Sequence, residues 1–203
     1  MSVWVQPRLS PERYLELERA AESRSEYYDG RVFAMSGGTY NHARITANLS
    51  GELYNALKNG PCSVVSNDLR IRVAPDGLYT YPDVVVVCGE PEFSDEKRDT
   101  LVNPVMIVEV LSQSTEGYDR GFKAAQYRRI ASLREYALVS QLEARIEVFR
   151  RQKGGDWLLS ESAGLTANCH FASVECDIAL ADVYGKIAFA SEGSNSPHPS
   201  SSE

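Results

Sequence analysis

Two carboxylic acids in valine-rich segments are the side chains of this sequence best placed to do chemistry. Asp83 stands at one end of the apolar run 81–87, and Glu109 lies inside the run 104–110. Runs of this length and composition are typical of strands covered on both faces, where an unpaired carboxylate is costly to bury. Each acid therefore needs a reason for its position, which can be a salt bridge, a capping role or a metal ion.

A lysine on the segment after the second run could join the two acids. Lys123 lies in the stretch 119–127, which reads as a helix, and Asp119, Lys123 and Tyr127 recur at i, i+4 and i+8 on one face of it. Mg²⁺ prefers oxygen ligands and keeps water, so one or two carboxylates and a substrate phosphate suffice to hold it. Such an ion would polarise a phosphoryl oxygen and activate water, and the lysine could orient that water or offset charge on the phosphate.

Each member of this set has a structural alternative. Asp83 could cap a turn or pair with Arg70 or Arg72, although the site role is favoured. Glu109 and Lys123 could form a retained buried ion pair without any catalysis. The residue types alone leave both interpretations open.

The segments that must position these residues suggest one unit of mixed helices and strands. Ser10 and Pro11 are good start signals for a helix over 10–21, and Asp29-Gly30 is a hairpin turn within 26–35. Apolar residues at helical spacing predict a helix over 40–58 that packs on a sheet; they are Ile45, Leu49, Leu53 and Leu57.

Further strands are predicted on both sides of the two acids. They fall near 63–66, 69–73, 135–140, 145–150 and 157–160, and the last two read as a hairpin around Gly154-Gly155. The strand–helix–strand order over 105–139 predicts a parallel pair joined by a crossover. We expect one domain over 1–189 and a disordered tail rich in Ser, Pro and Gly over 190–203.

Composition limits the class of protein. The chain has 203 residues, 43% of them hydrophobic and 24% charged, which is typical of a soluble globular protein. No apolar run approaches the roughly 18 residues of a membrane span, and the start is too polar for a signal peptide, so we expect a cytoplasmic protein without a membrane partner. The net charge of −7 argues against a broad nucleic-acid-binding surface but leaves room for a local site.

Four cysteines are present without the paired spacing of a zinc site: Cys62, Cys88, Cys169 and Cys176. We expect buried free thiols, because a disulfide framework is unusual in a chain of this size and expected compartment. His170 beside Cys169 is too small a set to indicate a metal site.

Four motifs occur in a fixed order: YPDVVVV at 81–87, VEVLSQST at 108–115, YDRGFK at 118–123 and REY at 134–136. In this order and spacing they resemble the Uma2 family, endonucleases of the restriction-endonuclease-like PD-(D/E)XK superfamily. The resemblance extends over most of the chain before the tail.

The resemblance implies an α/β restriction-endonuclease-like core, with a mixed β-sheet flanked by helices and additional antiparallel hairpins. It also implies Mg²⁺-dependent cleavage of DNA, with Mn²⁺ as an alternative ion, and a homodimer. It places Asp83 and Glu109 at metal-ligand positions and Glu26 at that of an additional acid. The usual superfamily lysine, two residues after the Glu, is Leu111 here, and in Uma2-like chains the lysine lies on the following helix, which is Lys123.

Several other polar residues keep more than one interpretation. Glu26 could also be an exposed hairpin residue, and His42 could contact a phosphate or transfer a proton, with a structural role favoured. Asp68 is either a site acid or a turn residue, Asp119 could cap the helix, and Tyr127 could be a core aromatic. The sequence thus supports a metal-dependent endonuclease, with a catalytically idle binding or assembly module on the same fold as the alternative.

Overall fold

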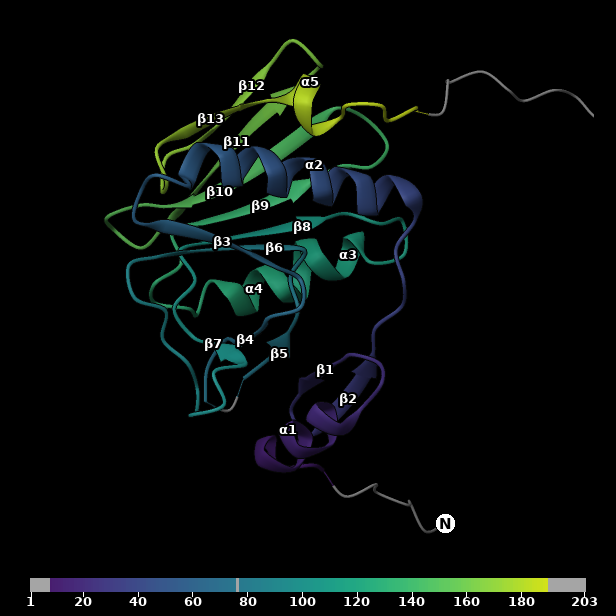
Figure 1. Cartoon of the computed structure of the whole chain (residues 1–203), viewed down its shortest axis with the longest axis vertical. Helices are drawn as coiled ribbons and strands as arrows, with labels where there is room; N and C mark the ends of the chain where they lie inside the picture. The colour runs from purple at the N-terminus through teal and green to yellow at the C-terminus, as the bar shows by residue number, and fades with distance from the viewer. Residues whose placement is uncertain (1–7, 76, 190–203) are drawn as a thin grey trace, which may run out of the picture.

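The computed structural model describes residues 8–75 and 77–189, and it has the mixed α/β fold that the sequence predicted. Its main sheet has the strand order β11-β10-β9-β8-β6-β3 (Figure 1). These strands are β3 (Cys62–Ser66), β6 (Val84–Cys88), β8 (Met106–Val110), β9 (Glu135–Val139), β10 (Arg145–Arg151) and β11 (Trp157–Ala163). Strands β8 and β9 are parallel, as the crossover pattern predicted, and the other neighbours are antiparallel.

Alternation along the central strands divides the core into two halves. Val84 and Val86 of β6 belong to one buried cluster, whereas Val85 and Val87 belong to the other. Successive side chains of a strand point to opposite faces, so a run of valines is the pattern expected for a strand covered on both sides.

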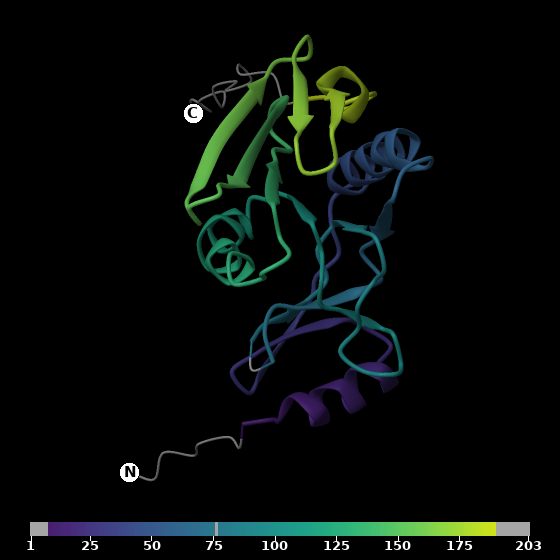
Figure 2. The same cartoon turned by 90° about the vertical axis from the view of Figure 1, so that its left-hand side faces the viewer.

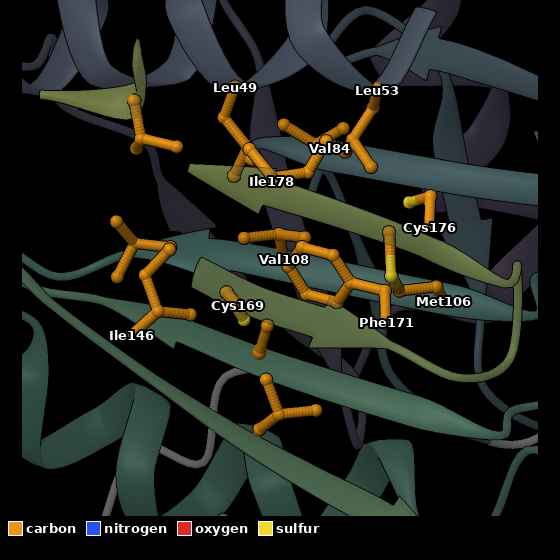
Figure 3. Close-up of a cluster of buried hydrophobic side chains, with 14 of the residues drawn as sticks. Leu49, Leu53, Val84, Met106, Val108, Ile146, Cys169, Phe171, Cys176 and Ile178 are labelled. Carbon is orange, nitrogen blue, oxygen red and sulfur yellow. The ribbon is translucent and has the colours of Figure 1, made fainter. Parts of the chain in front are cut away.

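The first face of the sheet is covered by α2 (Tyr40–Leu57) and by a small hairpin of β12 (Asn168–Phe171) and β13 (Cys176–Ala179). Leu49 and Leu53 of the helix and Phe171 and Ile178 of the hairpin converge on Val108 and its neighbours (Figure 3). The short helix α5 (Leu180–Val183) follows the hairpin and packs against α2.

The opposite face is covered by one continuous helical segment between β8 and β9. It consists of α3 (Glu116–Tyr118), a π-helical turn (Asp119–Lys123) and α4 (Ala124–Tyr127). Figure 1 shows α3 and α4 on the other side of the sheet from α2. Single π turns occur frequently at functional sites, and this one ends at Lys123.

A second, smaller sheet lies below the main one and carries the N-terminal helix α1 (Pro11–Ala20) at its outer side (Figure 2). Its strand order is β2-β1-β5-β4-β7. The strands are β1 (Ser25–Tyr28), β2 (Arg31–Ala34), β4 (Arg70–Arg72), β5 (Tyr79–Thr80) and β7 (Thr100–Leu101).

The predicted start of α1 and the predicted hairpin turn are both confirmed. The hydroxyl of Ser10 accepts from the backbone N–H of Arg13, and Pro11 is the first helical residue. Asp29 and Gly30 both have positive φ, 48° and 78°, as a type I′ turn requires.

The prediction of four free thiols is wrong for two of them. Cys62 and Cys88 are directly paired across β3 and β6 and form a disulfide, with their Cα atoms 3.9 Å apart. Sequence spacing gave no sign of this, because the pairing depends on the register of two strands whose cysteines are 26 residues apart along the chain. Cys169 and Cys176 are buried free thiols, as expected.

Two further predictions concern the C-terminal tail and membrane-spanning helices. The predicted disordered tail, 190–203, lies outside the described residues. Within the described part of the chain, no helix is long and apolar enough to cross a membrane.

Candidate active site

Asp83 and Glu109 lie side by side on neighbouring strands. In the antiparallel pair β6–β8, Val84 is opposite Val108, and continuing this register by one residue brings Asp83 opposite Glu109. The backbone N–H of Val110 donates to Oδ2 of Asp83 at 2.7 Å, which fixes this carboxylate at the end of the strand pair. The sheet register therefore accounts for the proximity of the two acids.

Lys123 and Tyr127 reach Glu109 from the helical segment that covers this face. Nζ of Lys123 lies 3.1 Å from Oε1 of Glu109, and the hydroxyl of Tyr127 donates to the same oxygen at 2.6 Å. The two side chains are one helical turn apart and so share a face of the segment. All three are buried, so Tyr127 is both a core aromatic and a partner of the acid.

Two more carboxylates surround the same lysine. Nζ of Lys123 is 3.1 Å from Oε1 of Glu26 and 3.5 Å from Oδ1 of Asp119. Oε1 of Glu26 also accepts from Thr80, and its Oε2 accepts from the hydroxyl of Tyr118 at 3.0 Å. Both oxygens of Glu26 thus have partners within the protein, and Asp119 forms an ion pair with Lys123.

Burial and charge shift the protonation of this cluster. Burial raises the pKa of Glu109 above its ordinary value, against the opposing effect of Lys123, and the negative charges of Asp83 and Asp119 raise it further. Burial alone would lower the pKa of Lys123, but the carboxylates of Glu109, Glu26 and Asp119 outweigh it and raise that pKa. The lysine is therefore a cation throughout the physiological pH range.

His42, at the start of α2, completes the surroundings of Asp83. Its Nε2 lies 3.2 Å from Oδ2 of Asp83, and this hydrogen bond raises the pKa of the imidazole despite its burial. A Cβ built on Gly38 would lie 2.9 Å from Nδ1 of His42, so the glycine permits the loop to pass close to the ring. Thr39 caps α2 by accepting from the backbone N–H of His42.

An open cleft of about 1280 Å³ lies over these side chains. Its walls come from the β1–β2 hairpin, the start of α2, the loop after β8 and the helical segment. Asp83, Glu109 and Lys123 all line it, so a ligand in the cleft can reach each of them.

The donor set suits a hard cation such as Mg²⁺ that keeps much of its water. The hydrogen bonds and ion pairs described for Asp83 reach Oδ2, and those described for Glu109 reach Oε1, so the other oxygen of each carboxylate is the one that could face an ion. Residues 8–75 and 77–189 contain no group of three or more His, Cys, Asp or Glu arranged to hold a metal. Two protein carboxylates with water and substrate oxygens are nevertheless a common way to bind Mg²⁺.

The structure decides two alternatives that the sequence left open, the pairing of Asp83 with Arg70 and the position of Asp68. Arg70 donates to the hydroxyls of Tyr81 and Thr100 and pairs with Asp99, rather than with Asp83. Asp68 is an exposed residue in the turn after β3, where it pairs with Arg24 at 3.1 Å.

Two residues for which the sequence left a structural role open, His42 and Asp119, contact the site. The contact of Asp119 with Lys123 had a signal in their i, i+4 spacing, but the sequence also allowed Asp119 to be a helix cap. No local pattern signals the contact of His42 with Asp83, because it depends on how α2 packs across the sheet.

Comparisons with known proteins identify the family and support the fold of the chain. The family model Uma2, described as "Putative restriction endonuclease", matches residues 11–179. Two proteins of Synechocystis sp. (strain ATCC 27184 / PCC 6803 / Kazusa), both described as uncharacterized, are similar along most of their length. Protein slr1290 is 37% identical over 184 residues, 90% of this chain and 95% of that protein. Protein sll1609 is 35% identical over 164 residues, 81% of this chain and 93% of that protein.

A solved structure supports the fold. It is described as "a putative nuclease belonging to DUF820" from Anabaena variabilis ATCC 29413 and superposes with a TM-score of 0.69 at 18% identity, covering 85% of this chain and 96% of that chain. At this identity the likeness concerns the fold alone. The match of the family model over most of the chain is decisive for the family, and the chain belongs to the Uma2 family.

Proposed function

We propose that this protein is a divalent-metal-dependent endonuclease that hydrolyses phosphodiester bonds in DNA. The observation that carries the proposal is the meeting of Asp83, Glu109 and Lys123 in one open cleft. The family to which the chain belongs supports the reaction class.

The two strand acids would hold the ion, and Mg²⁺ is the best match to their oxygens, with Mn²⁺ as the alternative. When bound, such an ion supplies Lewis-acid polarisation of a phosphoryl oxygen and lowers the pKa of water. Glu26, which the resemblance offers as a third ligand, has protein donors on both oxygens and would first have to exchange them.

Lys123 provides a fixed positive charge at the floor of the cleft. Its surrounding carboxylates keep it protonated, so it acts as a donor and a point charge rather than as a general base. It would orient the attacking water and offset the negative charge that develops on the phosphate. Tyr127 and Asp119 hold Glu109 and Lys123 in position.

Nicking of supercoiled plasmid DNA tests the proposal. Wild-type protein should nick in Mg²⁺ or Mn²⁺ and stop in EDTA, and Asp83→Ala should lose at least about a hundredfold in rate, comparable to the loss of other electrostatic catalytic groups. Asp156→Ala, which alters an exposed acid in the turn between β10 and β11, is the matched control and should keep the wild-type rate. Equal nicking by Asp83→Ala and wild type would refute the assignment.

A wild-type protein that binds Mn²⁺ in calorimetry but cleaves no DNA would favour the alternative, a binding or assembly module that retains the fold. The homodimer is a second proposal from the resemblance. Light scattering on the full chain would decide it, with twice the chain mass of 22.5 kDa as the expected value.

A further inference from the structure

One wall of the cleft has an apolar surface that the hydrolysis of a phosphate does not require. Phe33, on β2, and Met35, just after it, both line the cleft, and the two residues are 46% and 37% exposed. A contiguous patch of exposed apolar side chains often marks a surface that binds a ligand or a partner.

The register of the β1–β2 hairpin places this surface directly beside the catalytic cluster. Phe33 is the cross-strand partner of Glu26, so their side chains are on the same face of the hairpin. Tyr28 lies two residues from Glu26 on that face and also lines the cleft. An edge-to-face contact with Phe122, at a centroid distance of 4.7 Å, holds the ring of Tyr28.

The charge of the cleft limits how many phosphates it can bind. Among the described residues that line it, Arg24 and Lys123 are the Arg and Lys side chains, and Lys123 already contacts three carboxylates. The lining acids outnumber them: Glu22, Glu26, Asp83, Glu109 and Asp119. A protein that makes about six to ten phosphate contacts along a duplex neutralises these phosphates with Lys and Arg, and the two cations described in this cleft are too few for that.

We propose that the hairpin face of Tyr28, Phe33 and Met35 binds unpaired nucleobases by stacking, which makes single-stranded DNA the preferred ligand of the cleft. The inference rests on the proposed nuclease function and adds the form of the substrate. Stacking is suited to an acidic cleft, because every base has an apolar π-face whatever the charge of its backbone. Arg24, at the end of the same face, pairs with Asp68 and donates to the backbone carbonyl of Asn67, and it could exchange these exposed contacts for one flanking phosphate.

Binding of a fluorescein-labelled 12-nucleotide oligothymidylate, measured by anisotropy, tests the surface. The measurement uses the full chain in Ca²⁺, with gel analysis of the oligonucleotide to verify that it stays intact, and compares it with the matching dA·dT duplex. Phe33→Ala should weaken binding of the single strand by about 5- to 150-fold, the range for loss of one stacking contact. Phe33→Tyr should restore most of it.

Val32→Ala is the matched control. Val32 is next to Phe33 on the same strand and equally exposed at 44%, but its partner is Tyr27, so it lies on the other face of the hairpin. It should bind as the wild type does. The salt dependence gives a second readout, since one or two phosphate contacts predict a slope of log affinity against log salt of only about −0.7 to −1.4.

Preference for the duplex, a slope steeper than about −4, or equal losses in Phe33→Ala and Val32→Ala would overturn the inference. A change of molecular mass in Phe33→Ala would also overturn it, because the face would then be a subunit contact. The two proposals can fail separately. If Asp83→Ala abolishes plasmid nicking and Phe33→Ala does not change single-strand binding, the nuclease function is supported and the stacking surface is refuted. If single-strand binding depends on Phe33 but the protein cleaves no DNA, the stacking surface is supported and the nuclease function is refuted.

Discussion

At the scale of single residues, the site is organised around one buried cation. Lys123 has three carboxylates within 3.5 Å, whereas the strand position two residues after Glu109 is occupied by the apolar Leu111. Leu111 is buried in the core cluster beneath the helical segment. The helix thus supplies the charge that the strand does not.

Replacing Lys123 by Met should lower the free energy of unfolding of the protein. Glu109, Glu26 and Asp119 would lose their shared cation, and removing one partner of a buried ion pair costs about 3–5 kcal/mol. Urea denaturation should reveal this as a lower midpoint, and Lys123→Met combined with Glu26→Gln should recover part of the loss because one uncompensated charge is gone. Equal midpoints for Lys123→Met and wild type would contradict the ion-pair account.

Asp83→Asn separates metal binding from folding. The carboxylate of Asp83 raises the pKa of Glu109, so its removal relieves like-charge repulsion but also weakens the contact with His42, while the amide oxygen can still accept from Val110; these effects oppose each other, and the stability in EDTA should stay close to that of wild type. Saturating Mn²⁺ at about 100 times its dissociation constant should stabilise the wild type by about 2.7 kcal/mol and the variant much less. Thermal melts with and without Mn²⁺ measure both effects, and an equal metal-induced shift in both proteins would remove Asp83 from the ligand set.

At the scale of elements, the strength of the local sequence signal decides which helices and strands could be predicted. The long periodic helix α2, the hairpin with its Asp-Gly turn and the parallel pair β8–β9 were all predicted, because each has a strong local or crossover signal. Strands β5 and β7 have two residues each and no periodicity to detect. The small hairpin β12–β13 was also missed, because its residues alternate over only four positions.

The site shows the same division. Asp83 and Glu109 could be predicted together from two adjacent strands, and Lys123 from the helix that follows them. The contact of His42 with Asp83 and the disulfide between Cys62 and Cys88 depend on packing between distant segments. Local sequence does not encode such contacts.

The disulfide between β3 and β6 should stabilise the end of the main sheet. It closes a loop over a sequence separation of 26, for which the chain-entropy account gives about 3.5 kcal/mol at 25 °C. Dithiothreitol and the double variant Cys62→Ser/Cys88→Ser should therefore lower the midpoint of urea denaturation by similar amounts, and the reductant should not change the variant. A wild-type midpoint that does not change with the reductant would mean that the disulfide contributes no stability.

At the scale of the whole molecule, the site lies where the two sheets meet. Glu26 comes from the smaller sheet, whereas Glu109 and Lys123 come from the main sheet and its covering helices. The geometry of the site therefore depends on how firmly the smaller sheet and α1 are held together. Arg70, buried at 3% exposure, is central to this region and joins Tyr81, Thr100 and Asp99.

Asp99 makes the cohesion of this region dependent on pH. Hydrogen bonds from Arg19 of α1, with the charge of Arg70 adding, lower the pKa of Asp99 from 3.8 to about 2. The charged carboxylate thus stabilises the fold at any pH above about 4, and this contribution disappears as pH falls through the folded-state pKa of about 2. Because the side chain is 35% exposed, solvent screening limits the contribution to about 1 kcal/mol.

Asp99→Asn should accordingly be less stable than wild type at pH 7 by about 1 kcal/mol, and the two proteins should converge as the pH is lowered from 4 toward 2. Urea denaturation at a series of pH values measures the difference, with Asp156→Asn as the control for loss of an exposed acid. A difference that stays constant down to pH 2 would show that the amide perturbs packing rather than charge. A difference that also vanishes at neutral pH in 1 M salt would confirm that the charge of Asp99 is what holds α1 to the smaller sheet, since salt screens an ion pair of this exposure.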